Sequence, residues 1–235
     1  SNGETVVSNP INRLDNEWTG YNLNIDWDLG NTTFRSITSY YEYDFFQFFD
    51  YDATPLAIVS SAEGFPDGET KFEQWSQEFR LTSAADGPLT WLAGAMYAED
   101  TNESLQSFSV EALTELGFVA FTNGLANYTQ DTESWAVYGQ VGYDLTDRLN
   151  LHGSLRYTDE DKDIDYLSTV VIQGFAVPLG DIEGFETSLE ENWSGHIGLD
   201  WSVSDNTLLY ARFSRGFKSG GFFAAFTDNN DQLTP

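Results

Sequence analysis

The stretch SWAVYGQVGYDLTDRLNLHGSLRY, residues 134–157, decides the fold of this 235-residue chain. Apolar side chains recur at every second position, with a few interruptions, on each side of Thr146-Asp147. They are Trp135, Val137, Val141, Tyr143 and Leu145, then Leu149, Leu151, Leu155 and Tyr157. A period of two indicates a β-strand with one apolar face. Because Thr and Asp suit tight turns, the stretch predicts a hairpin of two amphipathic strands.

The same alternation occurs on both sides of this hairpin. Clear copies span residues 21–29, 89–97 and 193–203, and weaker copies span 71–83 and 206–219. Residues 33–46 form another weak copy. We expect its apolar face to carry Ile37, Tyr41, Tyr43 and Phe45. In total the pattern predicts about eight strands, and no helical period competes with it.

The connections between these strands are of two kinds. Tight polar turns are expected at Gly30-Asn31, 85–88, Thr146-Asp147 and 204–206, and long connections at 47–70, 104–127 and 166–184. Short turns at one end and long loops at the other are typical of an outer-membrane β-barrel, whose short turns are periplasmic and whose long loops are extracellular.

The apolar faces have the length that a membrane requires. The face of residues 149–157 extends about 30 Å, which at a tilt near 45° spans roughly 21 Å of bilayer. Aromatic rings near strand ends favour a lipid interface; they are Trp27, Tyr43, Trp91, Tyr97, Tyr143, Tyr157, Trp193 and Trp201. The alternative, a soluble ligand-binding β-barrel or sandwich, instead predicts Trp27, Trp91, Trp135 and Trp201 in a dry core.

Composition excludes several classes of protein. A formal charge of −28 argues against binding nucleic acid, which requires a basic surface, and the absence of Cys excludes disulfides. No apolar run is long enough for a membrane-spanning helix, and no leader opens the chain, so we expect any export signal outside this segment. We find no nucleophile elbow and no phosphate-binding Gly loop, and we therefore expect no enzyme and no cofactor.

Several motifs resemble those of one family. The run YARFSRGFKSGGFF (210–223) closely resembles a signature of TonB-dependent outer-membrane receptors, and SQEFRLTS (76–83) looks like a strand of the same family. Further similar stretches are WDLGNTTFRSITSYYEYD (27–44), LAGAMYAEDT (92–101) and WAVYGQVGYDLTDRLNLHGSLRYTDEDKD (135–163). The resemblance covers most of the chain from about residue 17 onward.

The resemblance implies a fold, a location and partners. Receptors of this family have a barrel of about 22 strands, filled by an N-terminal plug domain, and they use a TonB complex to import scarce nutrients. It implies that residues 1–235 are an internal part of the barrel domain, without the plug, the TonB-contacting segment or the C-terminal strands. The expected surroundings are bacterial outer-membrane lipid and lipopolysaccharide. The expected ligand is an unknown small molecule: a siderophore-iron, cobalamin-like or carbohydrate ligand.

Two other membrane functions are left open by the residues themselves. A passive porin needs a constricting loop and a charged eyelet, of which the loops give no clear sign. A small structural barrel would instead close from these eight or so strands alone.

The family signature concentrates scarce cations. Alternation places Tyr210, Arg212, Ser214, Gly216 and Lys218 on one side of the strand, which we expect to face the lumen, as we do Arg80 and Arg156. The cations would pair with carboxylates of the plug or guide an anionic substrate. Alternatively, Arg212 and Lys218 neutralise acidic neighbours on adjacent strands.

Three further clusters are weaker candidates for binding sites. Phe46, Phe48, Phe49 and Tyr51 are either an aromatic ligand platform or part of an interfacial girdle. The carboxylates of TDEDKDID (158–165) would share one face of a strand above the membrane, but they do not match an EF-hand loop. His152 and His196, the two histidines, belong to neighbouring polar faces but have no placed third ligand, so we expect no metal site.

Overall fold

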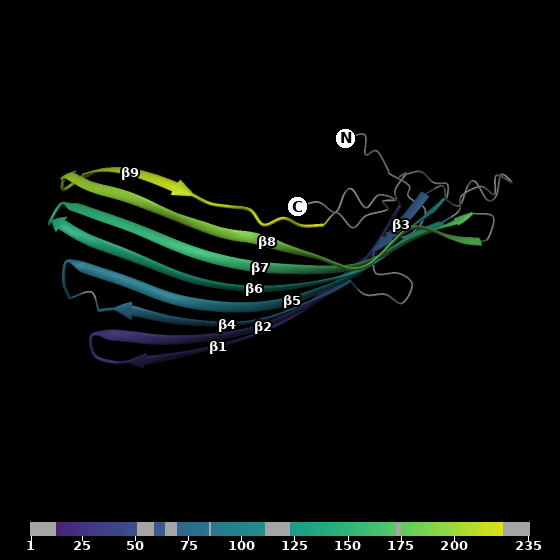
Figure 1. The fold of residues 1–235 in the computed structure, drawn as a ribbon, viewed down its shortest axis with the longest axis horizontal. Helices are drawn as coiled ribbons and strands as arrows, with labels where there is room; N and C mark the ends of the chain where they lie inside the picture. The colour runs from purple at the N-terminus through teal and green to yellow at the C-terminus, as the bar shows by residue number, and fades with distance from the viewer. Residues whose placement is uncertain are drawn as a thin grey trace, which may run out of the picture.

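The computed structural model describes residues 13–50, 59–63, 70–84, 86–110, 123–172 and 175–222. These residues form one antiparallel sheet (Figure 1). Its strands are β1 (Arg13–Asp28), β2 (Thr32–Asp50), β3 (Val59–Glu63), β4 (Thr70–Ser83), β5 (Leu89–Val110), β6 (Asn123–Thr146), β7 (Leu149–Ile172), β8 (Phe175–Ser204) and β9 (Thr207–Arg215). The described residues contain no helix long and apolar enough to cross a membrane.

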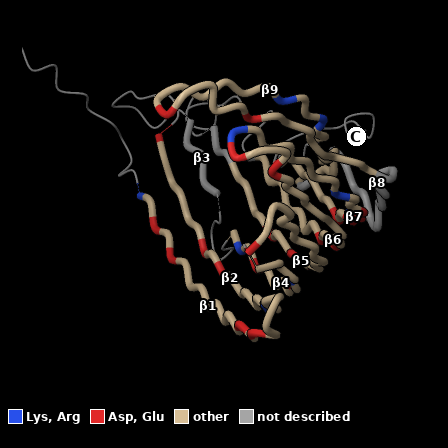
Figure 2. Tube along the Cα trace, turned by 90° about the vertical axis from the view of Figure 1, so that its left-hand side faces the viewer, with Lys and Arg blue, Asp and Glu red and all other residues tan. Residues whose placement is uncertain are grey.

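Neighbours in the sheet follow the order of the chain. The short β3 and the longer β4 both pair with β2 and β5, so they occupy a single strand position, one after the other. The sheet is strongly curved, with β1 and β9 at its edges, and these two edges do not pair within the described residues (Figure 2). The predicted antiparallel barrel wall is thus confirmed as an open, curved sheet.

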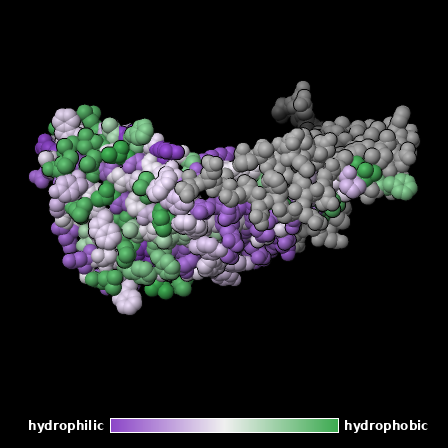
Figure 3. All heavy atoms as spheres, viewed as in Figure 1, coloured by the Kyte–Doolittle hydropathy of each residue, from purple (hydrophilic) through white to green (hydrophobic). Residues whose placement is uncertain are grey.

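The apolar faces lie on the convex side. Trp27, Trp135 and Trp201 are 66%, 44% and 49% exposed. Such exposure is opposite to the dry core that a soluble barrel predicts. Figure 3 shows the corresponding apolar surface over the end of the sheet that carries the short turns, with more hydrophilic surface beyond it.

The short turns occur where the sequence predicts them. At the first turn, Gly30 has a φ of 88°, which glycine adopts without strain, and its N–H donates to Asp28 Oδ1 at 2.7 Å. The backbone closes through a bond of 2.8 Å from Leu29 N–H to the carbonyl of Thr32. Between β6 and β7, the hydroxyl of Thr146 accepts from the N–H of Arg148 at 3.2 Å.

The long connections are predicted less well. Much of 104–127 and nearly all of 166–184 belong to strands, because β5 extends to Val110, β6 begins at Asn123, β7 ends at Ile172 and β8 begins at Phe175. The strands therefore continue well past their alternating apolar stretches. The apolar face that predicted the strands ends before these extensions, so the expectation of long loops was wrong there.

The predicted face of β2 is also wrong. Cross-strand register pairs Ile37 with Asn24 and Tyr41 with Gly20, which places Ile37, Tyr41, Tyr43 and Phe45 on the concave side. The convex residues of this strand include Phe34, whose ring stacks on Phe79 with centroids 5.9 Å apart. Because both faces of β2 carry aromatic rings, alternation alone does not reveal which face meets lipid.

The small buried core lies at the far end of the sheet. Ala126, Ile164 and Tyr166 are buried there, and Tyr128 and Phe222 pack against them. These residues come from β6, β7 and the segment after β9. The sheet therefore has little core at its turn end, where lipid would cover the convex face.

Candidate functional site

The concave face of the sheet holds a pocket of about 550 Å³ between β4 and β9. Alternation on each strand directs polar side chains into it, since the apolar partners point to the convex side. The polar lining is formed by Glu78, Arg80, Tyr138, Gln140, Ser154, Arg156, Ser194, His196, Arg212, Ser214 and Arg215. Four of the chain's ten Lys and Arg residues thus line the pocket, although the chain carries a net charge of −28.

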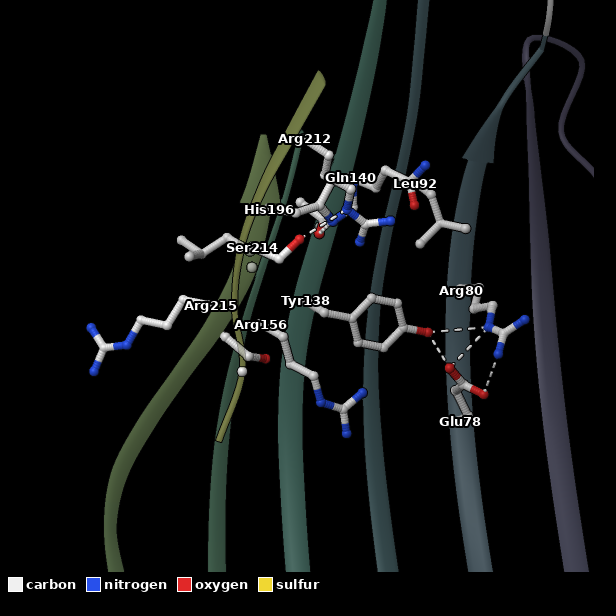
Figure 4. Close-up of a pocket in the computed structure, with 16 residues that line it drawn as sticks. Glu78, Arg80, Leu92, Tyr138, Gln140, Arg156, His196, Arg212, Ser214 and Arg215 are labelled. Atoms are coloured by element: carbon white, nitrogen blue, oxygen red, sulfur yellow. Dashed lines mark hydrogen bonds and ion pairs between the residues drawn. The ribbon is translucent and has the colours of Figure 1, made fainter. Parts of the chain in front are cut away.

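A compact network occupies one side of the pocket. Arg80 binds Glu78 through two hydrogen bonds, of 2.8 and 2.9 Å, and also donates to the Tyr138 hydroxyl at 3.1 Å. The Tyr138 hydroxyl donates to Glu78, as Figure 4 shows. The single carboxylate of the pocket is thus already neutralised by Arg80.

Arg156 lies next to this network but has only neutral partners. It donates to Thr158 at 3.0 Å and to the sulfur of Met96 at 2.8 Å, and its guanidinium lies 5.5 Å from the centre of the Tyr138 ring. A cation over an aromatic face is held without losing its charge. Among the described residues, no carboxylate forms an ion pair with Arg156.

Arg212 enters the pocket from the edge strand. It donates to the hydroxyl of Ser214 at 3.0 Å, and no described carboxylate pairs with it. Arg215, three residues later, points away from the pocket interior in Figure 4. Arg156 and Arg212 therefore contribute two positive charges to the pocket that the described residues do not neutralise.

Of the other predicted residues of the signature, Tyr210 lies within β9, whereas Gly216 and Lys218 lie beyond its end. Gly216 lines the pocket, whereas Tyr210 is 77% exposed on the edge strand and Lys218 is exposed. The strand, expected to reach residue 219, ends at Arg215. Glycines weaken strands, and no described strand pairs with the outer edge of β9.

The segment after β9 crosses to β7. There, Lys162 donates to the hydroxyl of Ser219 at 3.1 Å and to the carbonyl of Gly220 at 2.8 Å, while Ser219 also binds Glu160. These contacts hold the glycine-rich end of the signature against the concave face. The prediction that the signature is one continuous strand is therefore only partly right.

The described aromatic residues near residue 48 do not share one face of β2. Strand alternation puts Phe46 and Phe48 on one face of β2 and Phe49 on the other, and Tyr51 lies outside the described residues. The Arg13 guanidinium lies 5.1 Å from the centre of the Phe46 ring. A shared ligand platform of these rings is not what the structure shows.

Sequence reasoning missed two important residues, Glu78 and Tyr138. Both have the parity of the polar face, and Glu78 stands two positions before Arg80, a spacing that puts both side chains on one side of a strand. That spacing could have indicated from the sequence that Glu78 pairs with Arg80. The contact of Tyr138 with Glu78, by contrast, joins residues 60 positions apart and depends on strand pairing.

Comparisons with known proteins agree with this architecture. A model of the family described as TonB dependent receptor-like, beta-barrel matches residues 2–235. Pesticin receptors of Yersinia enterocolitica and Yersinia pestis are each 22% identical over 153 residues, which is 65% of this chain and 20% of theirs.

Solved structures show the same fold. The ferric yersiniabactin uptake receptor FyuA from Yersinia pestis superposes with a TM-score of 0.70 at 13% identity, covering 88% of this chain and 29% of that one. The ferric-catecholate import receptor Fiu from E. coli K12 gives 0.55 at 13% identity, covering 90% and 34%. The chain thus spans only about a third or less of the length of these relatives.

Proposed function

Because the chain belongs to the TonB-dependent receptor family, we propose that it is part of the barrel wall of a receptor that imports a scarce nutrient. Members of this family are transport receptors of the bacterial outer membrane, so we assign the chain no catalytic role. The observation that carries the proposal is the polar concave pocket opposite an exposed, apolar convex face. A passive porin or a small self-contained barrel is less well supported, because the family match spans residues 2–235.

We assign residues 1–235 to an internal part of the barrel domain. Within the part of the chain that the structure describes, the two edges of the sheet do not pair with each other, and the matches cover only 29% and 34% of the solved receptors. Reading the gene in both directions tests this assignment. A plug domain upstream and about fourteen further strands downstream are expected; an open reading frame confined to this segment would overturn it.

The nutrient that we propose is an iron chelate. Two solved relatives are described as a ferric yersiniabactin uptake receptor and a ferric-catecholate import receptor, which favours siderophore-iron over a cobalamin-like or carbohydrate ligand. Growth of a gene deletion strain tests the class. We expect a defect under iron restriction that a plasmid copy repairs, and no defect with limiting cobalamin or oligosaccharide. A defect in either of the latter media alone would contradict the proposal.

Arg156 and Arg212 are the residues that we propose to contact the missing plug. Neutral partners hold both side chains in the pocket, so their charges remain for acidic groups that arrive from outside the described residues. This interpretation differs from the alternative in which Arg212 and Lys218 neutralise carboxylates of adjacent strands. No described carboxylate pairs with either residue.

A double substitution tests this contact. Arg156→Gln with Arg212→Gln, made in the complete receptor, should loosen the plug and raise the passive entry of a large antibiotic such as vancomycin. Arg148→Gln is the matched control, because Arg148 binds Asp205 at 3.2 Å beside the short turns, outside the pocket. Unchanged antibiotic sensitivity in the double variant would show that the arginines do not hold the plug.

The convex aromatic rings are the proposed contact with outer-membrane lipid and lipopolysaccharide. Trp135, Tyr157 and Trp193 stand side by side across β6, β7 and β8, with ring centroids 5.2 and 5.1 Å apart. Amphipathic rings in such a row are typical of a membrane interface. Carboxylates of residues 158–165 follow immediately beyond this row.

A further inference from the structure

The chain's two histidines face each other across β7 and β8. His152 Nδ1 lies 3.4 Å from His196 Nε2, and the ring centroids are 5.4 Å apart. The His152 ring lies over Gly198, where a Cβ atom would approach the imidazole to 2.4 Å. Glycine at this position therefore gives the His152 ring the space to reach across the neighbouring strand.

The outer nitrogen of each ring has its own polar partner. His152 Nε2 lies 3.5 Å from Asp200 Oδ2, and His196 Nδ1 lies 2.6 Å from the hydroxyl of Ser154. When Asp200 and Ser154 accept the protons of these outer nitrogens, the two inner nitrogens are left unprotonated, and each carries a lone pair. Metal-binding histidines are oriented in this way, by a carboxylate or another acceptor on the far nitrogen.

The separation of the inner nitrogens suits one metal ion. Two histidine ligands at about 2.0–2.1 Å from a tetrahedral ion lie about 3.3–3.4 Å apart, and the observed separation is 3.4 Å. We propose that His152 Nδ1 and His196 Nε2 together bind one divalent transition-metal ion of the zinc, copper or nickel class. Imidazole is a favourable ligand for these metals.

The environment defines what kind of site this is. Described residues do not gather three His, Asp or Glu groups around one point. The site that we propose therefore takes two ligands from the described residues, with water or an anion at the other positions. Arg212, on β9, lies opposite Gly198 of β8 in the strand register. His196 and Arg212 line the same pocket (Figure 4). The charge of Arg212 weakens the attraction for a bare cation and favours an anionic further ligand such as chloride or hydroxide.

The ion has a route to the site. His152 is the fourth residue of β7, so it lies roughly 10 Å from the turn that precedes the strand. On the proposed function, this end of the barrel faces the periplasm, because the short turns of outer-membrane barrels are periplasmic, and divalent ions exchange with the medium there. The proposal concerns residues of the wall alone and is independent of which nutrient the receptor imports.

Metal titration of the complete gene product, purified without a polyhistidine tag, tests the site. We expect one Cu²⁺ ion per protein, with coupling to two nitrogens in its electron paramagnetic resonance spectrum, and competition by Zn²⁺. His152→Ala and His196→Ala should each remove one nitrogen coupling and weaken binding at least about tenfold. Asn24→Ala, a polar substitution on the concave face of β1, serves as the control and should leave binding unchanged.

Two further measurements test the site even if the histidine variants fail to fold. Asp200→Asn keeps both ligands and should weaken Cu²⁺ binding about 10–100-fold, because it removes the negative charge of the group that orients His152. In the wild-type protein, Zn²⁺ should protect both histidines from diethyl pyrocarbonate. Equal Cu²⁺ binding by the His152→Ala/His196→Ala double variant, or no wild-type binding at 100 µM Cu²⁺, would overturn the proposal and leave the two rings as a hydrogen-bonded pair.

Discussion

The two halves of β7 show opposite polarity. Between Leu149 and Tyr157 the apolar side chains point to the convex side, where Leu155 is 56% exposed. Between Thr158 and Ile172 most of the buried side chains point inward, among them Ile164, Tyr166 and Val170, and the aspartates of residues 158–165 face outward. The pairing of β7 with β8 is regular up to Tyr157, and all three register shifts between these strands occur after it.

The difference between the two halves follows from the solvent around each of them. In the turn-side half, lipid would demand an apolar convex face and complete backbone pairing. In the far half, water wets the outside, so the apolar residues pack inward and bulges are tolerated. Tyr157, at the boundary, stands within the row of aromatic rings that marks the interface.

The largest effect is expected from a charge on the convex face. Leu155→Arg should destabilise the complete receptor in lipid vesicles by about 2–3 kcal/mol, because an arginine inside the apolar band, between the interface row at Tyr157 and the bilayer midplane, loses much of its hydration. Leu167→Arg, on the same face of the same strand but in the far half, should cost about 0–1 kcal/mol. Urea unfolding measures both variants, and equal costs would remove the proposed boundary at Tyr157.

The second-largest loss of stability is expected from a substitution that crowds the concave face of the turn-side half. At Gly94 a Cβ atom would lie 2.4 Å from the Tyr138 ring and 2.9 Å from the carbonyl of Phe79. Gly94→Ala should therefore cost about 1–3 kcal/mol by displacing Tyr138 from Glu78.

The control for this substitution is Gly87→Ala, in the turn before β5. A Cβ atom there meets nothing within 4 Å, so its effect should stay within about 0.5 kcal/mol. If both alanines cost the same in urea unfolding, the Tyr138 contact does not stabilise the wall.

Removing the ring at the boundary should have a smaller effect. Tyr157→Ala removes the ring contacts with Trp135 and Trp193. It should lower the free energy of unfolding by about 1–2 kcal/mol more than the loss of a single lipid-facing ring does. Tyr143→Ala supplies that comparison, because Tyr143 also faces outward but near the short turns. Similar unfolding midpoints for the two variants would argue that the rings act singly.

The smallest effect concerns Asp100, which lies past the aromatic row on the concave face. Burial raises the pKa of Asp100, and the hydrogen bond from Thr132 opposes this rise. Since the raised pKa means that the folded state disfavours the charged form, Asp100→Asn should stabilise the protein at pH 7 by about 0.5 kcal/mol.

The pH dependence supplies the check on Asp100. The advantage of Asp100→Asn should shrink as the pH falls through the raised pKa and vanish below the ordinary value of 3.8, where both states bind the proton. Unfolding measured from pH 4 to 7 would refute the assignment if the difference between variant and wild type stayed constant.

The sequence predicts the turn-side half well and the far half poorly. Alternation in residues 149–157 is strong because one face meets lipid, and the tight turns need residues such as Gly30 with its φ of 88°. Beyond Tyr157 the apolar side chains change to the opposite face of the strand, as the buried Ile164 and Tyr166 show. Because we expected a single apolar face along each strand, the sequence predicted a loop there.

The site follows the same logic. The positions of Arg80, Arg156 and Arg212 on the polar face were predictable from parity alone. Their partners were not, because the contacts of Tyr138 and Met96 depend on which strands pair and in what register.

Quenching of single tryptophans by brominated lipids tests the central claim most directly, namely that the convex face of the turn-side half meets the bilayer. In the complete receptor, variants that retain only Trp27, Trp135 or Trp201 should be quenched strongly. A variant that retains only Trp18, which pairs with Tyr43 on the concave side, should not be quenched. Unquenched emission from Trp27, Trp135 and Trp201 would contradict the account and place these rings in a protein core.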